Sequence, residues 1–426
     1  MCHQIGKLVL GKTLSEKILS RKVGKDVSAG EIIVTDVDYM FAHDASGPLT
    51  IDQLRTMGIQ KPAYPDKTII IIDHAVPSPN KTISNNQEKL RKWAIKTGSR
   101  FSEAGRGICH QVLAEDYASP GQIILGTDSH TVTAGALTAF GTGMGATDVA
   151  VAIGLGKTWL RVPETIMIKL DGDLPTGVYS KDAMLTFIGK LTMEGATYKA
   201  LEFSGSAINN MRMDERLTLS NMAVEAGAKV GLISSDETTK KYLESRGRGE
   251  FFQKIMPDKK AEYTETLKFD ASEIEPTIAF PDTVDNIKTV SEAAGTEIQE
   301  VFIGSCTNGR IEDLRIAADI LKGKKVNPNT KLIVTPASRE TLLLAVQDLT
   351  LQTLIESGAT VTPPGCGVCF GALGGVPADG DRILTTSNRN FKGRTGNPLS
   401  GTYLASPATA AVTAIKGEIA DPREML

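Results

Sequence analysis

The stretch KTIIIIDH, residues 67–74, joins four consecutive isoleucines to an aspartate and a histidine. An apolar, β-branched run of this length without polar alternation is typical of a strand that is buried on both faces, as in a parallel sheet. Similar short apolar runs recur along the chain at 121–125, 300–303, 331–334 and 381–384. Because longer amphipathic stretches separate these runs, the sequence predicts an α/β protein with largely parallel sheets.

The organisation of the chain predicts three domains. Two amphipathic stretches, residues 309–323 and 338–358, are predicted to be helices that each end at a glycine. The middle of the chain is richer in charged residues, which predicts a second, smaller α/β unit, and the proline-bearing segment 275–284 is predicted to link this unit to a third. The predicted domains are 1–161, 162–283 and 284–426.

The composition is that of a globular protein, and it favours neither a nucleic-acid nor a membrane partner. The 47 basic and 50 acidic residues give a formal net charge of -3, and the sequence has no long basic tract. No run approaches the ~20 apolar residues of a membrane span, and the first residues are too polar for a signal peptide. Five cysteines, an odd number, argue for reduced thiols rather than a disulfide framework. We therefore expect a cytoplasmic location.

Unusual polar residues directly follow several of the apolar runs. Asp73 and His74 follow the isoleucines. Three further polar segments follow other runs, namely GTDSHT (126–131), GSCTN (304–308) and TTSNRNFKGR (385–394). Polar loops are common at strand ends in any protein. Ligands of parallel α/β sheets bind beyond the carboxyl ends of the strands, however, so the repetition predicts that these segments line one site.

Two cysteines in PPGCGVC (363–369), Cys366 and Cys369, have a spacing that fits a redox dithiol, half of a zinc site or part of an iron-sulfur cluster. A thioredoxin-like pair normally opens a helix early in a small domain, and a structural zinc site needs a second close pair of ligands, which this sequence lacks. Cys306, which has small neighbours, offers a third thiolate, although a lone cysteine is more often a buried packing residue. Three thiolates suit a 4Fe-4S cluster in which one iron has no protein ligand.

Four motifs together resemble the aconitase superfamily of iron-sulfur hydro-lyases. They are GTDSHT, IGSCTN, PGCGVC and SNRNFKGR, in this order along the chain. The resemblance implies three α/β domains around a shared iron-sulfur cleft. It also implies one 4Fe-4S cluster that is held by Cys306, Cys366 and Cys369 and has one open iron. Gly367 stands where the family often has a serine or another small residue, a departure that leaves ligation unaffected.

The resemblance assigns roles to further residues in two groups. Catalytic roles fall to Asp73, His74, His110, Asp128, His130 and Glu225. Substrate contacts fall to Ser129, Asn221, Asn388, Arg389 and Arg394. The arginines suit this role because a guanidinium group matches a carboxylate at two points.

His74 is expected to give a proton to the leaving hydroxyl while Asp73 orients the imidazole, since the expulsion of hydroxide needs a general acid. A histidine that only caps a strand-end loop would look the same in the sequence. Asn221 and Glu225 are four residues apart and so share a helix face, although such a polar pair more often faces solvent. The segment HDASGP (43–48) lies where the family has a substrate-contacting loop, but we assign no side-chain contact there.

The implied reaction is the reversible dehydration or isomerisation of a 2-hydroxy di- or tricarboxylic acid. We expect 3-isopropylmalate as the substrate, with homoaconitate, citramalate and 2,3-dimethylmalate as alternatives. In the family the base is a serine on a swivelling C-terminal module, and this chain is expected to end before that module. A separate small subunit is therefore expected to carry the module and the serine. An RNA-binding regulatory protein and a structural zinc protein are the alternatives from other classes, and the lack of a basic patch argues against the first.

Overall fold

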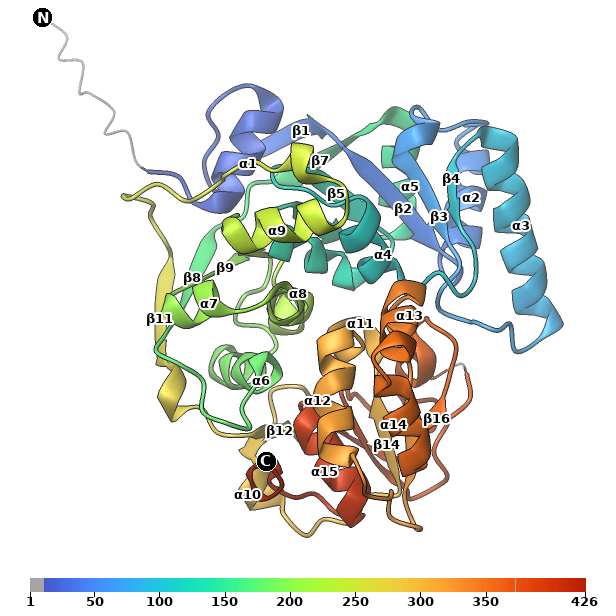
Figure 1. Ribbon diagram of the computed structural model, residues 1–426. Coiled ribbons are helices and arrows are strands. Elements are labelled where there is room, and N and C mark those ends of the chain that lie inside the picture. Colours follow the sequence, from blue (N-terminus) through green and yellow to red (C-terminus); the bar gives the residue numbers. More distant parts are fainter. Residues whose placement is uncertain (1–10, 372) are drawn as a thin grey trace, which may run out of the picture.

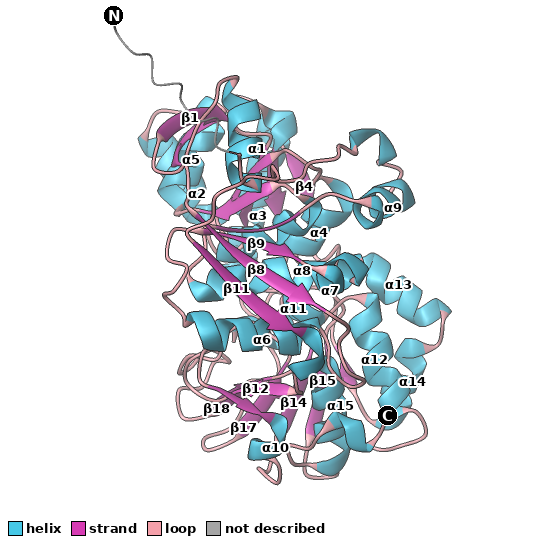
Figure 2. Ribbon diagram, turned by 90° about the vertical axis from the view of Figure 1, so that its left-hand side faces the viewer, coloured by secondary structure: helices cyan, strands magenta, loops and turns pink. Residues whose placement is uncertain are grey.

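The computed structural model describes residues 11–371 and 373–426, so Cys2 and the start of the predicted first domain lie outside the described residues. Within these residues, three sheets and one two-stranded ribbon are surrounded by helices (Figures 1 and 2). The chain is an α/β protein with largely parallel sheets, as the apolar runs predict. None of the helices in the described part of the chain is long and apolar enough to span a membrane.

A five-stranded, all-parallel sheet with the order β4-β3-β2-β5-β6 forms the N-terminal part. Its strands are β2 (Tyr39–His43), β3 (Thr68–Ile71), β4 (Arg100–Ser102), β5 (Ile123–Gly126) and β6 (Phe140–Gly143). The isoleucine run thus forms β3, and the run at 121–125 forms most of β5. Because successive side chains of a strand point to opposite faces, Ile70 and Ile71 belong to different hydrophobic clusters.

The helices of this part are α1 (Leu14–Val23), α2 (Gly47–Thr56), α3 (Lys81–Thr97), α4 (Cys109–Asp116) and α5 (Ala146–Leu155). Helix α3 is capped at its start by Asn80, whose side chain accepts a hydrogen bond from the backbone of Ile83, and at its end by Gly98 in the left-handed conformation. An antiparallel ribbon joins β1 (Ile32–Asp36) to β7 (Lys157–Arg161). A 3₁₀ segment, Ser129–Leu137, follows β5.

The middle part contains a four-stranded, all-parallel sheet with the order β10-β9-β8-β11. Its strands are β8 (Thr165–Asp171), β9 (Ala200–Ser204), β10 (Val230–Ile233) and β11 (Glu265–Asp270). Its helices are α6 (Ser180–Leu191), α7 (Ser206–Asn210), α8 (Met213–Met222) and α9 (Glu237–Ser245). Figure 1 shows this part mainly in green, and α8 runs into a 3₁₀ segment, Ala223–Ala226.

The C-terminal part contains a seven-stranded sheet with the order β13-β12-β18-β17-β14-β15-β16, in which only the pairs made by β12 are antiparallel. Its strands are β12 (Thr277–Ala279), β13 (Ile287–Thr289), β14 (Glu300–Ile303), β15 (Lys331–Val334), β16 (Thr360–Val361), β17 (Arg382–Thr385) and β18 (Gly401–Leu404). Its helices are α10 (Val290–Ala293), α11 (Ser305–Asn308), α12 (Ile311–Leu321), α13 (Arg339–Gln347), α14 (Thr350–Ser357) and α15 (Pro407–Lys416). Short 3₁₀ turns elsewhere are Pro65–Lys67, Gly249–Phe251, Ala271–Glu273, Gly367–Phe370 and Pro422–Glu424.

Two local expectations are wrong in this part. The predicted helix 338–358 is broken into α13 and α14, because Leu349 adopts a left-handed conformation with φ of 65° and the Asp348 carboxylate accepts a hydrogen bond from the backbone of Thr350. The segment 275–284, which was expected to be a linker, contains β12, which pairs with β13 and β18. The three-domain division itself stays a prediction.

One hydrophobic cluster joins the N-terminal sheet to the C-terminal sheet. Phe41 and Ile71 of the first sheet share it with Phe302 and Ile383 of the second, and Cys306 lies in the same cluster. Since both sheets contribute to one core, the loops at their carboxyl ends are held against each other.

The contact between the 3₁₀ segment and the middle sheet can be tested by a substitution at Gly135. A Cβ at this position would collide with the backbone oxygen of Gly231 in β10. We expect Gly135→Ala to lower the free energy of unfolding by about 1–3 kcal/mol, because backbone must move to make room. Thermal and denaturant unfolding would measure the change. Gly401→Ala is the control, since a Cβ there meets only Pro281 at 3.5 Å, and equal stability of the two variants would contradict the contact.

Candidate active site

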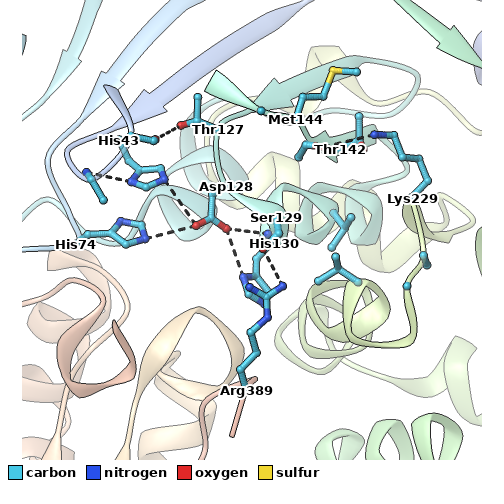
Figure 3. A pocket seen from close by; sticks show the side chains of 18 of the residues that line it. His43, His74, Thr127, Asp128, Ser129, His130, Thr142, Met144, Lys229 and Arg389 are labelled. Atoms are coloured by element: carbon cyan, nitrogen blue, oxygen red, sulfur yellow. Dashed lines mark hydrogen bonds and ion pairs between the residues drawn. The ribbon is translucent and has the colours of Figure 1, made fainter. Parts of the chain in front are cut away.

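A cavity of about 730 Å³ lies beyond the carboxyl ends of β2, β3 and β5 (Figure 3). All three parts of the chain contribute to its walls. The predicted site residues that line it are His74, Asp128, Ser129, His130, Arg389 and Arg394. The other predicted residues, Asp73, His110, Asn221, Glu225, Asn388, Cys306, Cys366 and Cys369, are buried behind this lining. The polar segments that follow the apolar runs therefore converge in one place.

His74 is held between two carboxylates. Its Nδ1 lies 2.8 Å from Oδ1 of Asp73, and its Nε2 lies 3.4 Å from Oδ2 of Asp128. Burial disfavours a charged imidazole, but the negative charges of Asp73 and Asp128 outweigh burial and raise the pKa of His74 well above 6.5. Burial likewise opposes the charge of Asp73, yet the positive charge of His74 lowers the pKa of Asp73 to about 2. At neutral pH the two residues form an ion pair, with a proton available at Nε2 of His74.

The turn that carries this ion pair is fixed by Asp44, which follows β2. The Asp44 carboxylate accepts hydrogen bonds from the backbone N–H groups of Asp73 (3.2 Å), His74 (2.9 Å) and Ala75 (3.0 Å). The side chain of Gln87 donates a further hydrogen bond to Asp44 at 3.0 Å. This support is a tertiary contact between two strand-end loops, so no local pattern in the sequence indicates it.

His43, the last residue of β2, stacks on His74. The ring centres are 3.9 Å apart, and the planes are inclined by 18°. Burial and then the positive charge of His74 lower the pKa of His43 to about 4, so this ring is neutral at neutral pH. Sequence reasoning placed the segment 43–48 near the site without assigning a side chain, and the structure adds His43 to the cavity wall.

Asp128 accepts hydrogen bonds from two directions on the same oxygen. Its Oδ1 accepts a hydrogen bond from the backbone N–H of His130 at 2.7 Å and lies 2.9 Å from Nε2 of His110. Burial tends to raise the pKa of Asp128, but the surrounding histidines hold it well below 3.8. His110 contacts Asp128 through Nε2, and its buried Nδ1 has no hydrogen-bond partner among the described residues.

Glu225 links His130 to Arg389. Its Oε1 lies 2.7 Å from Nε2 of His130, and both of its oxygens accept from Nε of Arg389, at 2.9 and 3.0 Å. Nη2 of Arg389 also donates to the Ser129 hydroxyl at 2.9 Å. Glu225 and Asn221 are both buried, so the alternative that this pair faces solvent is wrong. The network fixes the direction in which Arg389 presents its remaining N–H groups to the cavity.

Two of the three predicted cysteines, Cys306 and Cys369, contact the side-chain amide of Asn388, and Cys366 lies beside Cys369. Nδ2 of Asn388 donates to Sγ of Cys306 at 3.3 Å, and Sγ of Cys369 lies 3.7 Å from Oδ1 of the same side chain. The thiols of Cys366 and Cys369 hydrogen-bond to each other. This bond lowers the pKa of Cys369 well below its usual value against the effect of burial, and the Arg394 guanidinium, 3.3 Å from the sulfur, lowers it further. The arrangement therefore favours a thiolate at Cys369, whereas burial raises the pKa of Cys306 to about 11 and the hydrogen bond with Cys369 raises the pKa of Cys366 well above 9.0.

Tight backbone turns hold these cysteines. Ser305, directly before Cys306, has a left-handed conformation with φ of 76°, which is uncommon for a residue other than glycine and is typical of functional loops. Gly367 lies between the other two cysteines with φ of 62°, and a Cβ there would collide with Thr335. Glycine adopts this conformation and close approach without strain.

Lys181 supports the same region from α6. Its side chain is fully buried, and its Nζ donates to the backbone oxygens of Thr386 (3.0 Å) and Ser387 (2.5 Å). Burial lowers the pKa of Lys181 to about 7. These two carbonyls directly precede Asn388 and Arg389, so the lysine positions both side chains. A lysine near the start of an amphipathic helix gives no signal of this role in the sequence.

Other groups of side chains could hold a single metal ion. One ligand atom each from His110, His130 and Cys306 lie within 4.8 Å of one another, and the same holds for His43, Asp44, Asp73 and His74. The first group shares Cys306 with the three cysteines, whereas both carboxylates of the second group are already hydrogen-bonded to His74.

Comparison with known proteins gives a consistent result. The model of the aconitase family (aconitate hydratase) matches residues 16–297 and 288–417. The chain is 54% identical to the 3-isopropylmalate dehydratase large subunit of Elusimicrobium minutum, over 97% of this chain and 99% of that protein. It is 50% identical to 3-isopropylmalate dehydratase large subunit 1 of Thermotoga maritima, over 98% and 100%. It is 45% identical to the homoaconitase large subunit of Thermus thermophilus, over 98% of both chains.

Among solved structures, the crystal structure of Thermococcus kodakaraensis aconitase X (holo-form) aligns with a TM-score of 0.48 at 14% identity, covering 88% of this chain and 89% of that chain.

The charge on His74 can be tested with Asp73→Asn. Loss of the Asp73 charge removes the largest interaction that raises the pKa of His74, so we expect this pKa to fall toward or below 6.5. NMR titration of histidine-labelled protein would measure it. Asp52→Asn, at an exposed ion pair with Lys89, is the control. An unchanged pKa of His74 would show that Asp128 alone sets its charge.

The same pair defines a pH window of stability. The pKa of His74 is raised in the folded state. Its contribution to the free energy of unfolding is therefore full below pH 6.5 and is lost as pH rises through the folded pKa. The pKa of Asp73 is lowered, so its contribution is present above pH 3.8 and is lost as pH falls toward about 2. The pair therefore stabilises the fold across neutral pH.

Proposed function

The chain belongs to the aconitase family, and from this premise we propose that it is the large subunit of a 3-isopropylmalate dehydratase. Such a hydro-lyase removes water from a 2-hydroxy acid and returns it at the neighbouring carbon. The observation that carries the proposal is the convergence of three buried thiols beside a cavity that is lined by His74, Arg389 and Arg394.

The residues present fit a 4Fe-4S cluster held by Cys306, Cys366 and Cys369. All three thiols are buried, and N–H groups of Asn388 and Arg394 point at two of the sulfurs, as is usual around cluster ligands. A single ion held by histidines and Cys306 would leave the other two thiols unused. When bound, the cluster would supply an iron without a protein ligand as a Lewis acid for the substrate hydroxyl.

The protein residues have distinct roles in this proposal. His74 gives its Nε2 proton to the leaving hydroxyl, and Asp73 stabilises the charged imidazole before the transfer. Arg389 and Arg394 bind substrate carboxylates; the buried Nε of Arg394 has no partner among the described residues, so it is available for this purpose. Glu225 and His130 orient Arg389 from behind.

Apolar side chains in the cavity support the choice of substrate. Val132, Met144, Val224 and Ala228 line it together with the polar groups, and an isopropyl group would find contacts there. The relatives with 54% and 50% identity are 3-isopropylmalate dehydratase subunits, and the homoaconitase subunit has 45%. Homoaconitate, citramalate and 2,3-dimethylmalate are the alternatives.

A separate small subunit completes the proposed enzyme. The most similar relatives are named large subunits, and their lengths match this chain nearly throughout. We propose that the small subunit carries the swivelling module with the serine that removes the α-proton. The cytoplasmic location and the absence of a nucleic-acid partner stay predictions from the composition.

The cluster assignment is tested by Cys306→Ser, Cys366→Ser and Cys369→Ser. Each should lose the cluster, because serine replaces a thiolate ligand, whereas Cys109→Ser should keep it. Cys109 is buried in the same core, and its backbone N–H donates to the carboxylate of Asp73. Iron and sulfide analysis after anaerobic reconstitution would measure the content. A full cluster in any of the first three variants removes that cysteine from the ligand set.

The activity is tested by reconstituting the chain anaerobically, alone and with the small subunit from the same genome. We expect no turnover from the chain alone, because the base is proposed to belong to the small subunit, and turnover with the pair. Among the four candidate acids, 3-isopropylmalate should have the highest kcat/KM. A preference for another acid would identify that acid as the substrate, and turnover by the chain alone would show that it carries its own base.

A further inference from the structure

The ribbon formed by β1 and β7 exposes an apolar face. Ile32, Val34 and Trp159 are 71%, 67% and 57% exposed, whereas Ile33 and Leu160 on the opposite face are buried in the N-terminal core. Val34 and Trp159 lie directly opposite each other in the register, so the three side chains form one continuous patch. A tryptophan exposed beside two aliphatic residues is typical of a binding surface.

The patch continues into a cationic cluster around Tyr198. Arg161, two residues after Trp159 and therefore on the same face, places its guanidinium 4.7 Å from the centre of the Tyr198 ring. Nζ of Lys229 lies 5.6 Å from the centre of the same ring. Among the described residues, no carboxylate lies within 4.0 Å of either cation, whereas Lys157 on the same ribbon is paired with Asp36. Neither cation is in an ion pair within the described part of the chain, although Glu164 lines the same hollow as Arg161 and Nζ of Lys229 donates to the backbone oxygen of Gly143 at 3.4 Å.

Tyr198 is held rigidly in this place. Its backbone is left-handed, with φ of 58°, and its N–H donates to the backbone oxygen of Gly227 at 3.1 Å. Its hydroxyl accepts a hydrogen bond from the backbone of Arg161 at 3.3 Å. A strained conformation that is fixed by two hydrogen bonds is common at binding sites.

This surface leads directly to the active-site cavity. Tyr198 and Lys229 line that cavity. Tyr198 also lines a second hollow of about 180 Å³, together with Arg161 and Glu164. The exposed patch, the cation pair and the mouth of the active site are therefore continuous. We define the ribbon surface as Ile32, Val34, Trp159, Arg161, Tyr198 and Lys229.

We infer that the ribbon surface is the docking site of the small subunit, an inference that rests on the proposed function. The partner places apolar side chains on Ile32, Val34 and Trp159 and a carboxylate between Arg161 and Lys229. Two features favour this occupant. The base must reach the cavity, and the ribbon surface borders its mouth. A second copy of this chain would bring the same unpaired cations together, which like-charge repulsion disfavours.

The binding test uses the anaerobically reconstituted chain and the small subunit from the same genome, with titration calorimetry for Kd. Trp159→Ala and Arg161→Glu should each raise Kd by at least about 10-fold, since Trp and Arg dominate binding at interface centres. The effect of Arg161→Glu should shrink in high salt, because it is electrostatic. The matched controls are Ile95→Ala, at a side chain 74% exposed on α3, and Lys322→Glu after α12, which should leave Kd within about 2-fold.

Two further measurements keep the outcomes distinct. Hydrogen exchange of the wild-type chain should slow in β1, β7 and residues 196–199 when the small subunit is added, which needs no variant. At saturating small subunit, Trp159→Ala should recover the wild-type kcat.

If the wild-type pair binds and turns over but both variants keep the wild-type Kd and the ribbon stays unprotected, the docking site is elsewhere. If the wild-type pair neither binds nor turns over, the proposed function fails. If the chain alone forms dimers that Trp159→Ala dissociates, the ribbon joins two copies and the inference is overturned.

Discussion

The charge of Asp128, whose side chain is 16% exposed at the cavity wall, is the constraint on which the site depends. Its carboxylate lies within 2.9–3.8 Å of ring nitrogens of His43, His74, His110 and His130. A carboxylate removed from water is costly unless charges and N–H groups replace its hydration. The four rings come from the ends of two strands, from a helix and from a 3₁₀ segment, so the charge is compensated only when the N-terminal sheet and its connections are complete. Stability and the geometry of the site thus have a common origin.

The same constraint makes the four rings chemically different. His74 touches two carboxylates and carries a proton, whereas the stacked ring of His43 is neutral because burial and a neighbouring positive charge act on it together. His130 also lies between two carboxylates, Asp128 and Glu225, and its pKa is raised although burial opposes its charge, so protonation is favoured on His74 and His130 and disfavoured on His43. Local geometry, rather than residue type, decides which histidine can act as an acid.

Features with a local cause could be predicted from the sequence. The continuous β-branched runs became β3, β14 and β15, because a strand buried on both faces needs an unbroken apolar run. The polar segments after these strands converge because parallel strands end at the same edge of a sheet. The break at Leu349 could not be predicted, since the helical spacing of apolar residues continues across it. The roles of Asp44 and Lys181 depend on partners 29 and more residues away in sequence, and such contacts leave no pattern around the residue itself.

The buried amino group of Lys181 restricts movement of the middle part of the chain against the C-terminal part. It is carried by α6 of the middle part, and its acceptors belong to the loop after β17 of the C-terminal part. Any hinge motion between these parts would draw the buried amino group away from its only two hydrogen-bond acceptors among the described residues, at a cost of several kcal/mol. The middle and C-terminal parts are therefore held together beside the cavity, and a loosening of this contact would displace Asn388 and Arg389 together.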